Sequence, residues 1–274
     1  MPATAPAHSK PATEPPFGAM LRRWRGLRGM SQLGLALEAE TSARHLSFLE
    51  TGRARPSREM ALRLAESLDL PLRERNAMLV AAGFAPIYGN RPLDDADLSQ
   101  ARRALDFILE RHDPFPALVA DRGWNLVMAN RGAVAMMGRL GLPKGPGPLN
   151  IIKLLVDPEG IRPALVNWAE TVGHMLSRVA AEARARGDDP VLSRLLAEAR
   201  AFPDVPAREQ VDAVPQPPLL ELIYEIDGQR TRWFSTVTSF GTACDATLQD
   251  LKIEAFHPAD AATEAVARSW AAAG

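Results

Sequence analysis

Three serines, Ser31, Ser42 and Ser57, each stand directly before a short segment whose apolar residues have helical spacing, and this arrangement strongly constrains the fold. A serine in this position can accept a hydrogen bond from a backbone N–H of the following turn, so each one predicts the start of a helix. Only three residues separate the first such helix, Gln32 to Ala39, from the next, Ala43 to Thr51. The pattern therefore predicts two short helices joined by a tight turn.

The segments on either side extend this pattern to five helices. One begins at Phe17 and ends before Gly29, and another follows Ser57. A further helix begins after Pro71 and ends at Gly83. The apolar positions that recur at three- and four-residue spacing are Phe17, Met20, Leu21 and Trp24 in the first helix, and Ala61, Leu64, Ala65 and Leu68 in the fourth. We therefore predict an all-α five-helix domain over residues 17–90.

The regions outside this domain have a different composition. Residues 1–16 are rich in Pro and Ala without apolar periodicity, which predicts a disordered arm. Pro, Gly, Asn and Asp accumulate between residues 84 and 99, where a domain boundary is expected near Asn90 to Asp97. A chain of 274 residues exceeds the ~100 to 200 residues of a usual domain, so we predict a second domain over residues 98–270.

The second domain mixes helices with hairpins. After a helix from Leu98 to Arg111, two apolar runs flank residues 121–123, and two more flank Asp227-Gly228, a pair that favours a two-residue hairpin turn. Long helical patterns cover residues 162–186 and 190–201, a further strand follows at residues 251–256, and a last helix covers residues 259–268. The glycine-containing tract 140–148 is expected to be a loop. We predict an α+β domain with a small antiparallel sheet.

Charge is divided unevenly between the two predicted domains. Residues 1–90 hold twelve Lys or Arg and eight Asp or Glu, a net of +4, whereas the rest of the chain holds twenty and twenty-five, a net of −5. A positive domain has a reason to meet phosphate. No apolar run approaches the ~18 residues that a membrane span needs, and Cys244 is the single cysteine, so we expect a cytoplasmic protein without membrane insertion.

The segment from Ala43 to Thr51 is amphipathic in a way that suits the major groove of DNA. At ~100° per residue, Leu46 and Leu49 share one side of the helix. Arg44 on the other side can pair with guanine through two hydrogen bonds, and Phe48 can contact a thymine methyl. The candidate DNA-contacting residues here are Ser42, Ala43, Arg44, Ser47, Phe48 and Thr51.

Three arginines follow this helix at once. Arg53, Arg55 and Arg58 would lie close to the phosphates of a bound duplex and would position the domain without reading sequence. From periodicity alone, an ordinary helical bundle with a solvated arginine face explains the segment equally well.

A family resemblance favours the DNA-binding interpretation. Ser31-Gln32, Leu35-Ala36, the segment 42–49 and the spacing of Glu50, Gly52, Pro56 and Ser57 resemble the helix-turn-helix of the XRE, or lambda-repressor-like, family. In that family the Gln after the cap contacts the DNA backbone and braces the recognition helix, which the resemblance assigns to Gln32. This sequence departs from the pattern at Gly34, within a helix, and at Glu40, a turn position that is usually Gly.

The remainder of the chain resembles one branch of that family. The stretches PFPALV, WNLVMAN and TVTSFGTACDATLQDLKIEAFHPADAAT are similar to members that join an XRE domain to an MmyB-like ligand-binding domain, and the resemblance extends from Phe17 to Ala267. It implies a PAS-like sensor domain that binds fatty-acid-like molecules.

The second domain also has an excess of large, soft apolar residues, which predicts a ligand pocket between the sheet and the helices that cover it. Filling of an ordinary core is the alternative for any single one of them. Alternation along residues 230–240 places Phe234, Thr236, Thr238 and Phe240 on one face, and His174 or Arg178 could anchor a carboxylate. The candidate ligand-binding residues are Trp124, Met128, Met136, Met137, Trp168, His174, Met175, Arg178, Tyr224, Phe234, Thr236 and Phe240.

No pattern in the sequence favours an enzyme or a metal site. Neither an H-E-x-x-H nor a G-x-S-x-G motif is present, and the five histidines are scattered. We therefore expect a DNA-binding regulator that is not an enzyme, needs no cofactor, and binds double-stranded DNA as a homodimer. Its second domain would sense a small apolar ligand, with a bound fatty acid as the first candidate. The alternative is a DNA-binding regulator controlled by a protein partner, whose sensor domain has a filled core and no small-molecule ligand.

Overall fold

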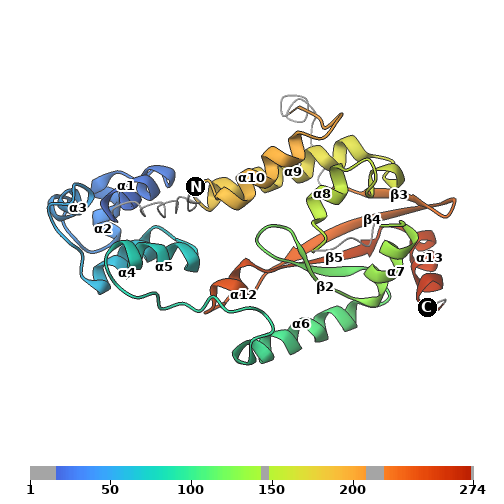
Figure 1. Cartoon of the computed structure of the whole chain (residues 1–274), viewed down its shortest axis with the longest axis horizontal. Coiled ribbons are helices and arrows are strands. Elements are labelled where there is room, and N and C mark those ends of the chain that lie inside the picture. Colours follow the sequence, from blue (N-terminus) through green and yellow to red (C-terminus); the bar gives the residue numbers. More distant parts are fainter. Residues whose placement is uncertain (1–16, 143–147, 208–218, 273–274) are drawn as a thin grey trace, which may run out of the picture. The chain divides into compact units, whose positions relative to one another are not determined.

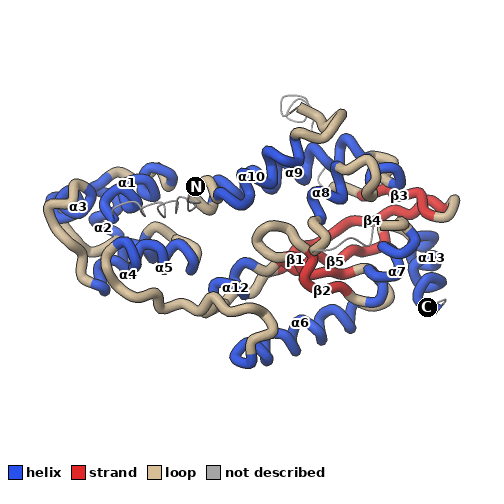
Figure 2. The backbone as a smooth tube through the Cα atoms, in the orientation of Figure 1, coloured by secondary structure: helices blue, strands red, loops and turns tan. Residues whose placement is uncertain are grey.

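The structure is a computed structural model that describes residues 17–142, 148–207 and 219–272. The chain divides into two compact units between Tyr88 and Gly89, and Figure 2 shows their helices, strands and loops. The predicted arm of residues 1–16 and the centre of the predicted loop 140–148 lie outside the described residues.

The described part of the N-terminal unit consists of five helices: α1 (Phe17–Leu27), α2 (Gln32–Glu38), α3 (Ala43–Glu50), α4 (Arg58–Ser67) and α5 (Leu72–Ala81). The three serines perform the predicted role, because the side chains of Ser31, Ser42 and Ser57 accept the backbone N–H groups of Gly34, His45 and Met60 at 2.9, 3.1 and 3.1 Å. The apolar faces meet in one core that includes Leu21, Trp24, Leu35, Leu46, Leu49, Leu64 and Leu79. The all-α prediction is confirmed.

The turn between α2 and α3 depends on an unfavourable backbone conformation. Glu40 has a φ of +50°, in the left-handed region that a side chain disfavours by roughly 1 to 2 kcal/mol. This conformation lets the chain reverse, and the N–H of Thr41 then donates to the carbonyl of Ala36 at 2.8 Å. The residue that departs from the family pattern thus adopts the conformation for which glycine is the usual choice.

The C-terminal unit is built around a five-stranded antiparallel sheet within its described residues. The strands are β1 (Ala117–Ala120), β2 (Leu126–Ala129), β3 (Leu222–Ile226), β4 (Gln229–Thr238) and β5 (Lys252–Pro258), in the order β2-β1-β5-β4-β3 (Figure 1). Both predicted hairpins are present. Asp227 and Gly228 have φ values of +53° and +72°, which matches the right-handed twist of the strands they join.

Helices cover both faces of this sheet (Figure 1). On one face, α6 (Ser99–His112) packs through Leu105 and Leu109 against Ala117, Val119 and Ile253. The opposite face meets α7 (Arg131–Arg139), α8 (Ile151–Val156), α9 (Trp168–Ala185), α10 (Pro190–Arg200) and α13 (Ala261–Ala272) around a larger core. The α+β prediction is confirmed.

Several elements were not predicted or begin elsewhere. Helices α7 and α8 were not predicted, although Asn130 and Asn150 cap them by accepting the N–H groups of Ala133 and Lys153. The helix expected from residue 162 begins at Trp168, after a short 3-10 turn at Arg162–Ala164. Two further short elements are a 3-10 turn at Ala96–Leu98 and α12 (Ala246–Asp250). None of the described helices is both long and apolar enough to cross a membrane.

Candidate functional site

Helix α3 has a buried back and an accessible front, as its sequence predicts. Leu46 and Leu49 are fully buried, whereas Arg44 and Thr51 are exposed, and Ala43, Ser47 and Phe48 are half-buried. The guanidinium of Arg44 lies 5.5 Å from the centre of the Phe48 ring, a cation–π contact that stabilises this solvent-facing charge. Ser42 begins the helix with its side chain engaged in capping.

Two details change what individual side chains on this front can offer. Phe48, placed by helical periodicity on the outward side of α3, is half-buried and offers only part of its ring to a partner. The hydroxyl of Thr51 donates to the carbonyl of Ser47 at 2.7 Å, so Thr51 offers its oxygen lone pairs and not its proton. Arg44 is therefore the strongest hydrogen-bond donor on this front.

The arginines that follow α3 are free to meet phosphate. Arg53, Arg55 and Arg58 are exposed, and no ion pair within the described residues engages any of them. An exposed, unpaired guanidinium can exchange its counterions for phosphate on binding a duplex. This charge continues from the exposed front of α3.

The last residue of α3 is held by a part-buried cluster that sequence reasoning missed. Arg25 donates to both carboxylate oxygens of Glu50, at 2.6 and 3.1 Å, and Gln32 donates to the same carboxylate at 2.8 Å. Burial alone would raise the pKa of Glu50. The hydrogen bonds from Arg25 and Gln32, together with the charges of Arg25 and Arg22, outweigh it and hold that pKa below its ordinary value.

The hydrogen bond from Gln32 to Glu50 is a contact through which Gln32 could brace α3, the role that the family resemblance assigns to it. Its side chain joins the start of α2 to the end of α3 through Glu50, and the side chain of Glu50 is only 3% exposed. Contact between Gln32 and DNA stays a prediction. The sequence signal for the cluster around Glu50 was the Glu-x-Gly spacing of the family pattern, which periodicity alone does not show.

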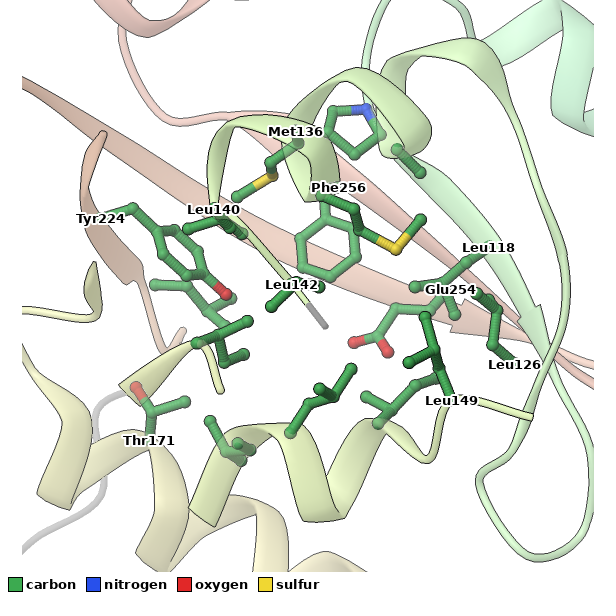
Figure 3. A pocket seen from close by; sticks show the side chains of 18 of the residues that line it. Leu118, Leu126, Met136, Leu140, Leu142, Leu149, Thr171, Tyr224, Glu254 and Phe256 are labelled. Atoms are coloured by element: carbon green, nitrogen blue, oxygen red, sulfur yellow. The ribbon is translucent and has the colours of Figure 1, made fainter. Parts of the chain in front are cut away.

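The C-terminal unit contains an apolar cavity between the sheet and helices α7, α8 and α9 (Figure 3). Its volume is about 100 Å³, measured as the space open to the centre of a water molecule, whereas one water needs about 10 to 15 Å³ on this measure. Nearly all of the wall is aliphatic or aromatic. The lining includes Leu118, Leu126, Ala133, Met136, Met137, Leu140, Leu142, Leu149, Ile151, Leu154, Leu155, Ile161, Met175, Leu222 and Phe256.

Three polar side chains interrupt this wall: Thr171 on α9, Tyr224 on β3 and Glu254 on β5. The carboxyl of Glu254 and the hydroxyl of Tyr224 point into the cavity (Figure 3). Burial raises the pKa of Glu254, and this effect exceeds the opposing effects of a hydrogen bond from Ser235 and the charge of Arg178. Burial, and then the charge of Glu254, raise the pKa of Tyr224, so its phenol keeps its proton. The cavity can therefore enclose an apolar body and offer hydrogen bonds at a few points.

Four of the twelve residues predicted for the ligand pocket line this cavity: Met136, Met137, Met175 and Tyr224. Trp124 is fully buried in the core outside it. The indole N–H of Trp168 donates to the carbonyl of Leu155 at 2.7 Å, and its ring lies under Arg162. His174 is half-buried on α9 and does not line the cavity. Neither of the two residues expected to anchor a carboxylate, His174 and Arg178, lines the cavity. The guanidinium of Arg178 lies over the ring of Trp124, 5.1 Å from its centre.

The residues predicted to face a ligand on β4 do not line this cavity. The ring of Phe234 stacks on His257 with 5.1 Å between centres, and the hydroxyl of Thr236 lies 3.1 Å from Nε2 of the same histidine. Phe240 and Met128 pack with the cluster under α6. The core face carries Trp233 instead. Alternation separates two faces of a strand but does not say which one meets the larger core.

Glu254 and Thr171 were missed, along with the aliphatic residues of α8. Glu254 shares its strand face with Phe256, and an acidic residue at an inward position of an otherwise apolar strand is an available signal. Thr171 gives no such signal, because a single threonine within a helical pattern indicates neither burial nor contact with a ligand.

Comparison with known proteins agrees with both halves of this description. A family model described as helix-turn-helix matches residues 21–75, and one described as the MmyB-like transcription regulator ligand binding domain matches residues 101–269. No curated protein matches the chain. The second model covers more than half of the 274 residues. The chain therefore belongs to the MmyB-like transcription regulators, with a helix-turn-helix region ahead of its ligand-binding domain.

Proposed function

We propose that this regulator binds specific double-stranded DNA sequences through α3 and adjusts that binding when a small apolar ligand enters the cavity of its C-terminal unit. The ligand is fatty-acid-like in its long apolar body and single polar end. The observation that carries the proposal is the cavity itself, a largely apolar space in a unit that belongs to a ligand-binding family.

The DNA-binding half of the proposal is supported by the chemistry of α3 and the residues after it. Arg44 can form the two-bond contact to guanine, and Ser47 and Phe48 add a hydrogen bond and an apolar contact. Arg53, Arg55 and Arg58 supply phosphate contacts. One such helix covers only a few base pairs, so we propose that two copies of the chain act together on two half-sites.

The ligand-binding half is supported by the composition of the cavity wall. Flexible Met136, Met137 and Met175 adapt to irregular shapes, and leucines provide most of the remaining surface. An apolar molecule that leaves water for this space gains roughly 25 cal/mol for each Å² of apolar surface buried.

Extraction of the purified full-length protein with organic solvent, followed by mass spectrometry, tests this directly. A stoichiometric apolar molecule is expected, and a variant with a filled cavity, Ala133→Phe, should lose it. Met128→Leu, a substitution on the opposite face of the sheet, is the matched control and should retain it. A protein that carries no such molecule, and whose melting temperature no apolar compound raises, would instead favour control by a protein partner.

A further inference from the structure

The polar groups of the cavity differ from those that a carboxylate ligand would need. Among the described residues that line it, Thr171, Tyr224 and Glu254 are the polar ones, and no Lys, Arg or His is present. A buried carboxylate requires a cation or several hydrogen-bond donors to replace its hydration. The wall instead presents a carboxyl of its own.

Glu254 is the central feature of this arrangement. It lies on β5 with 3% of its surface exposed, and its carboxyl points toward the cavity (Figure 3). No ion pair within the described parts of the chain engages this carboxyl, and the charge of Arg178 acts on it without a salt bridge. Its aliphatic surroundings on the cavity side include Leu118 and Leu126. The carboxyl therefore retains acceptor capacity toward any molecule that enters.

The hydroxyl of Thr171 supplies a second, independent observation. Thr171 is 1% exposed, and its Oγ1 is fully buried with no hydrogen-bond partner within the described residues. Leaving a buried hydroxyl without a partner destabilises the folded state, and a bound polar group would remove this cost. Tyr224, 4% exposed, adds a phenolic O–H that stays protonated. The cavity thus combines one acidic acceptor with two hydroxyls.

These groups discriminate between polar ends of different charge. A carboxylate placed beside Glu254 would bring two negative groups into a low-dielectric space, so one of them would have to take up a proton or the ligand would bind weakly. A hydroxyl or an ammonium group would donate to Glu254, and a hydroxyl could also accept from Tyr224 or Thr171.

Resting on the proposed function, we propose that the cavity selects an apolar molecule whose polar end donates hydrogen bonds, an alcohol or an amine, over a carboxylic acid of the same length. The expected ligand class is thereby narrowed from any fatty-acid-like compound to one whose polar end donates hydrogen bonds. The alcohol and the amine share this chemistry, and separate measurements with each identify which is preferred.

The test compares three ligands with the same ten-carbon chain, 1-decanol, decylamine and decanoate, by calorimetric titration of the full-length protein freed of bound lipid. We expect decanol or decylamine to bind at least tenfold more tightly than decanoate. Glu254→Gln removes the charge and keeps the shape, so it should strengthen decanoate binding and reduce the preference to less than threefold. Glu225→Gln, an exposed change on the neighbouring part of the sheet, should leave the preference as it is.

A second variant keeps the test informative if Glu254→Gln fails to fold. Thr171→Val preserves shape but lacks the hydroxyl, and it should weaken decanol severalfold while leaving decanoate unchanged. Decanoate binding to the wild-type protein as tightly as both decanol and decylamine, or more tightly, would overturn the inference and leave the proposed function standing. Binding of none of the three would overturn the proposed function, and the inference with it.

Discussion

Arg25 and Glu50 form a two-bond ion pair that joins α1 to the last residue of α3, with the guanidinium side chain 16% and the carboxylate side chain 3% exposed. The same guanidinium donates to the carbonyl of Met30 at 2.8 Å, and Gln32 completes the shell around the carboxylate. The helix proposed to read DNA is therefore fixed at its end by a charge from the first helix of its unit.

Replacing Glu50 with glutamine should destabilise the N-terminal unit by about 3 kcal/mol, because it leaves Arg25 without its charged partner in a largely desolvated position. Hydrogen exchange of amides within residues 17–88, followed by mass spectrometry, isolates this unit from the rest of the chain. Glu59→Gln is the matched control, because the exposed ion pair between Glu59 and Arg63 contributes little to the free energy of unfolding. Unchanged exchange in the Glu50 variant would contradict the role given to the pair.

The same carboxylate predicts how this unit responds to acid. Because the pKa of Glu50 is lower in the folded state than its ordinary value of 4.5, its contribution to stability is fully present above that value. It is lost as the pH falls through the lower, folded pKa. The difference in stability between the wild-type protein and Glu50→Gln should therefore be constant from pH 7 to 5 and shrink below about pH 4.5. A difference that grows with acid would have the wrong sign.

Glu40→Gly should stabilise the N-terminal unit by about 0.5 to 1 kcal/mol. The substitution relieves the left-handed strain at this turn, and part of the gain is offset by the greater freedom of glycine in the unfolded chain. The pair between Glu40 and Arg63, at 3.5 Å with Glu40 82% exposed, contributes little. Glu40→Ala removes the same pair but keeps the strain, so it should give no gain in urea unfolding followed by hydrogen exchange. Equal stabilisation by both would assign the effect to the side chain and not to the backbone.

Arg44→Ala and Arg53→Ala should weaken DNA binding in different ways. Loss of Arg44 is expected to cost roughly 1 to 3 kcal/mol and to relax preference at one base pair, whereas loss of Arg53 should weaken all sequences alike and reduce the salt dependence. Fluorescence anisotropy on a site selected from random DNA, at several salt concentrations, separates the two. Arg200→Ala, an exposed change on α10, should alter neither. Equal losses on selected and random DNA for Arg44→Ala would remove it from the reading residues.

The full-length protein is expected to be a homodimer, with its interface in the C-terminal unit, since two half-sites lie about 34 Å apart or a multiple of that. Light scattering at micromolar concentration should give twice the mass of the chain. A truncated protein covering residues 89–274 should give the same stoichiometry if it folds. A monomer both with and without DNA would contradict the prediction.

The helix starts of the N-terminal unit could be predicted because each depends on a local interaction. A serine that accepts a backbone N–H three residues later, or a left-handed turn before such a serine, involves only residues that are close together in the sequence. The Asp227-Gly228 hairpin is local in the same sense. Helices α7 and α8 were missed because they are short and show no long apolar period. Their caps differ in setting, since Asn130 directly follows a strand and Asn150 follows a loop.

The cavity could be predicted to exist between sheet and helices, but most of its wall could not. Its described lining combines side chains from four strands and three helices that lie far apart in sequence, and their meeting depends on register and packing. The face of β4 that lies toward the cavity could not be predicted for the same reason. Both faces of that strand carry aromatic rings, because α6 covers one side of the sheet and a larger core covers the other.

The cavity also bears on how long the regulator survives. A guest bound in the apolar cavity would give its lining side chains contacts that protein atoms do not supply there. A guest present at 100 times its dissociation constant would add about 2.7 kcal/mol to the stability of the folded unit. A gain of this size lowers the unfolded fraction about a hundredfold and slows degradation of the unfolded chain. The supply of ligand would then set the abundance of the regulator in addition to its affinity for DNA.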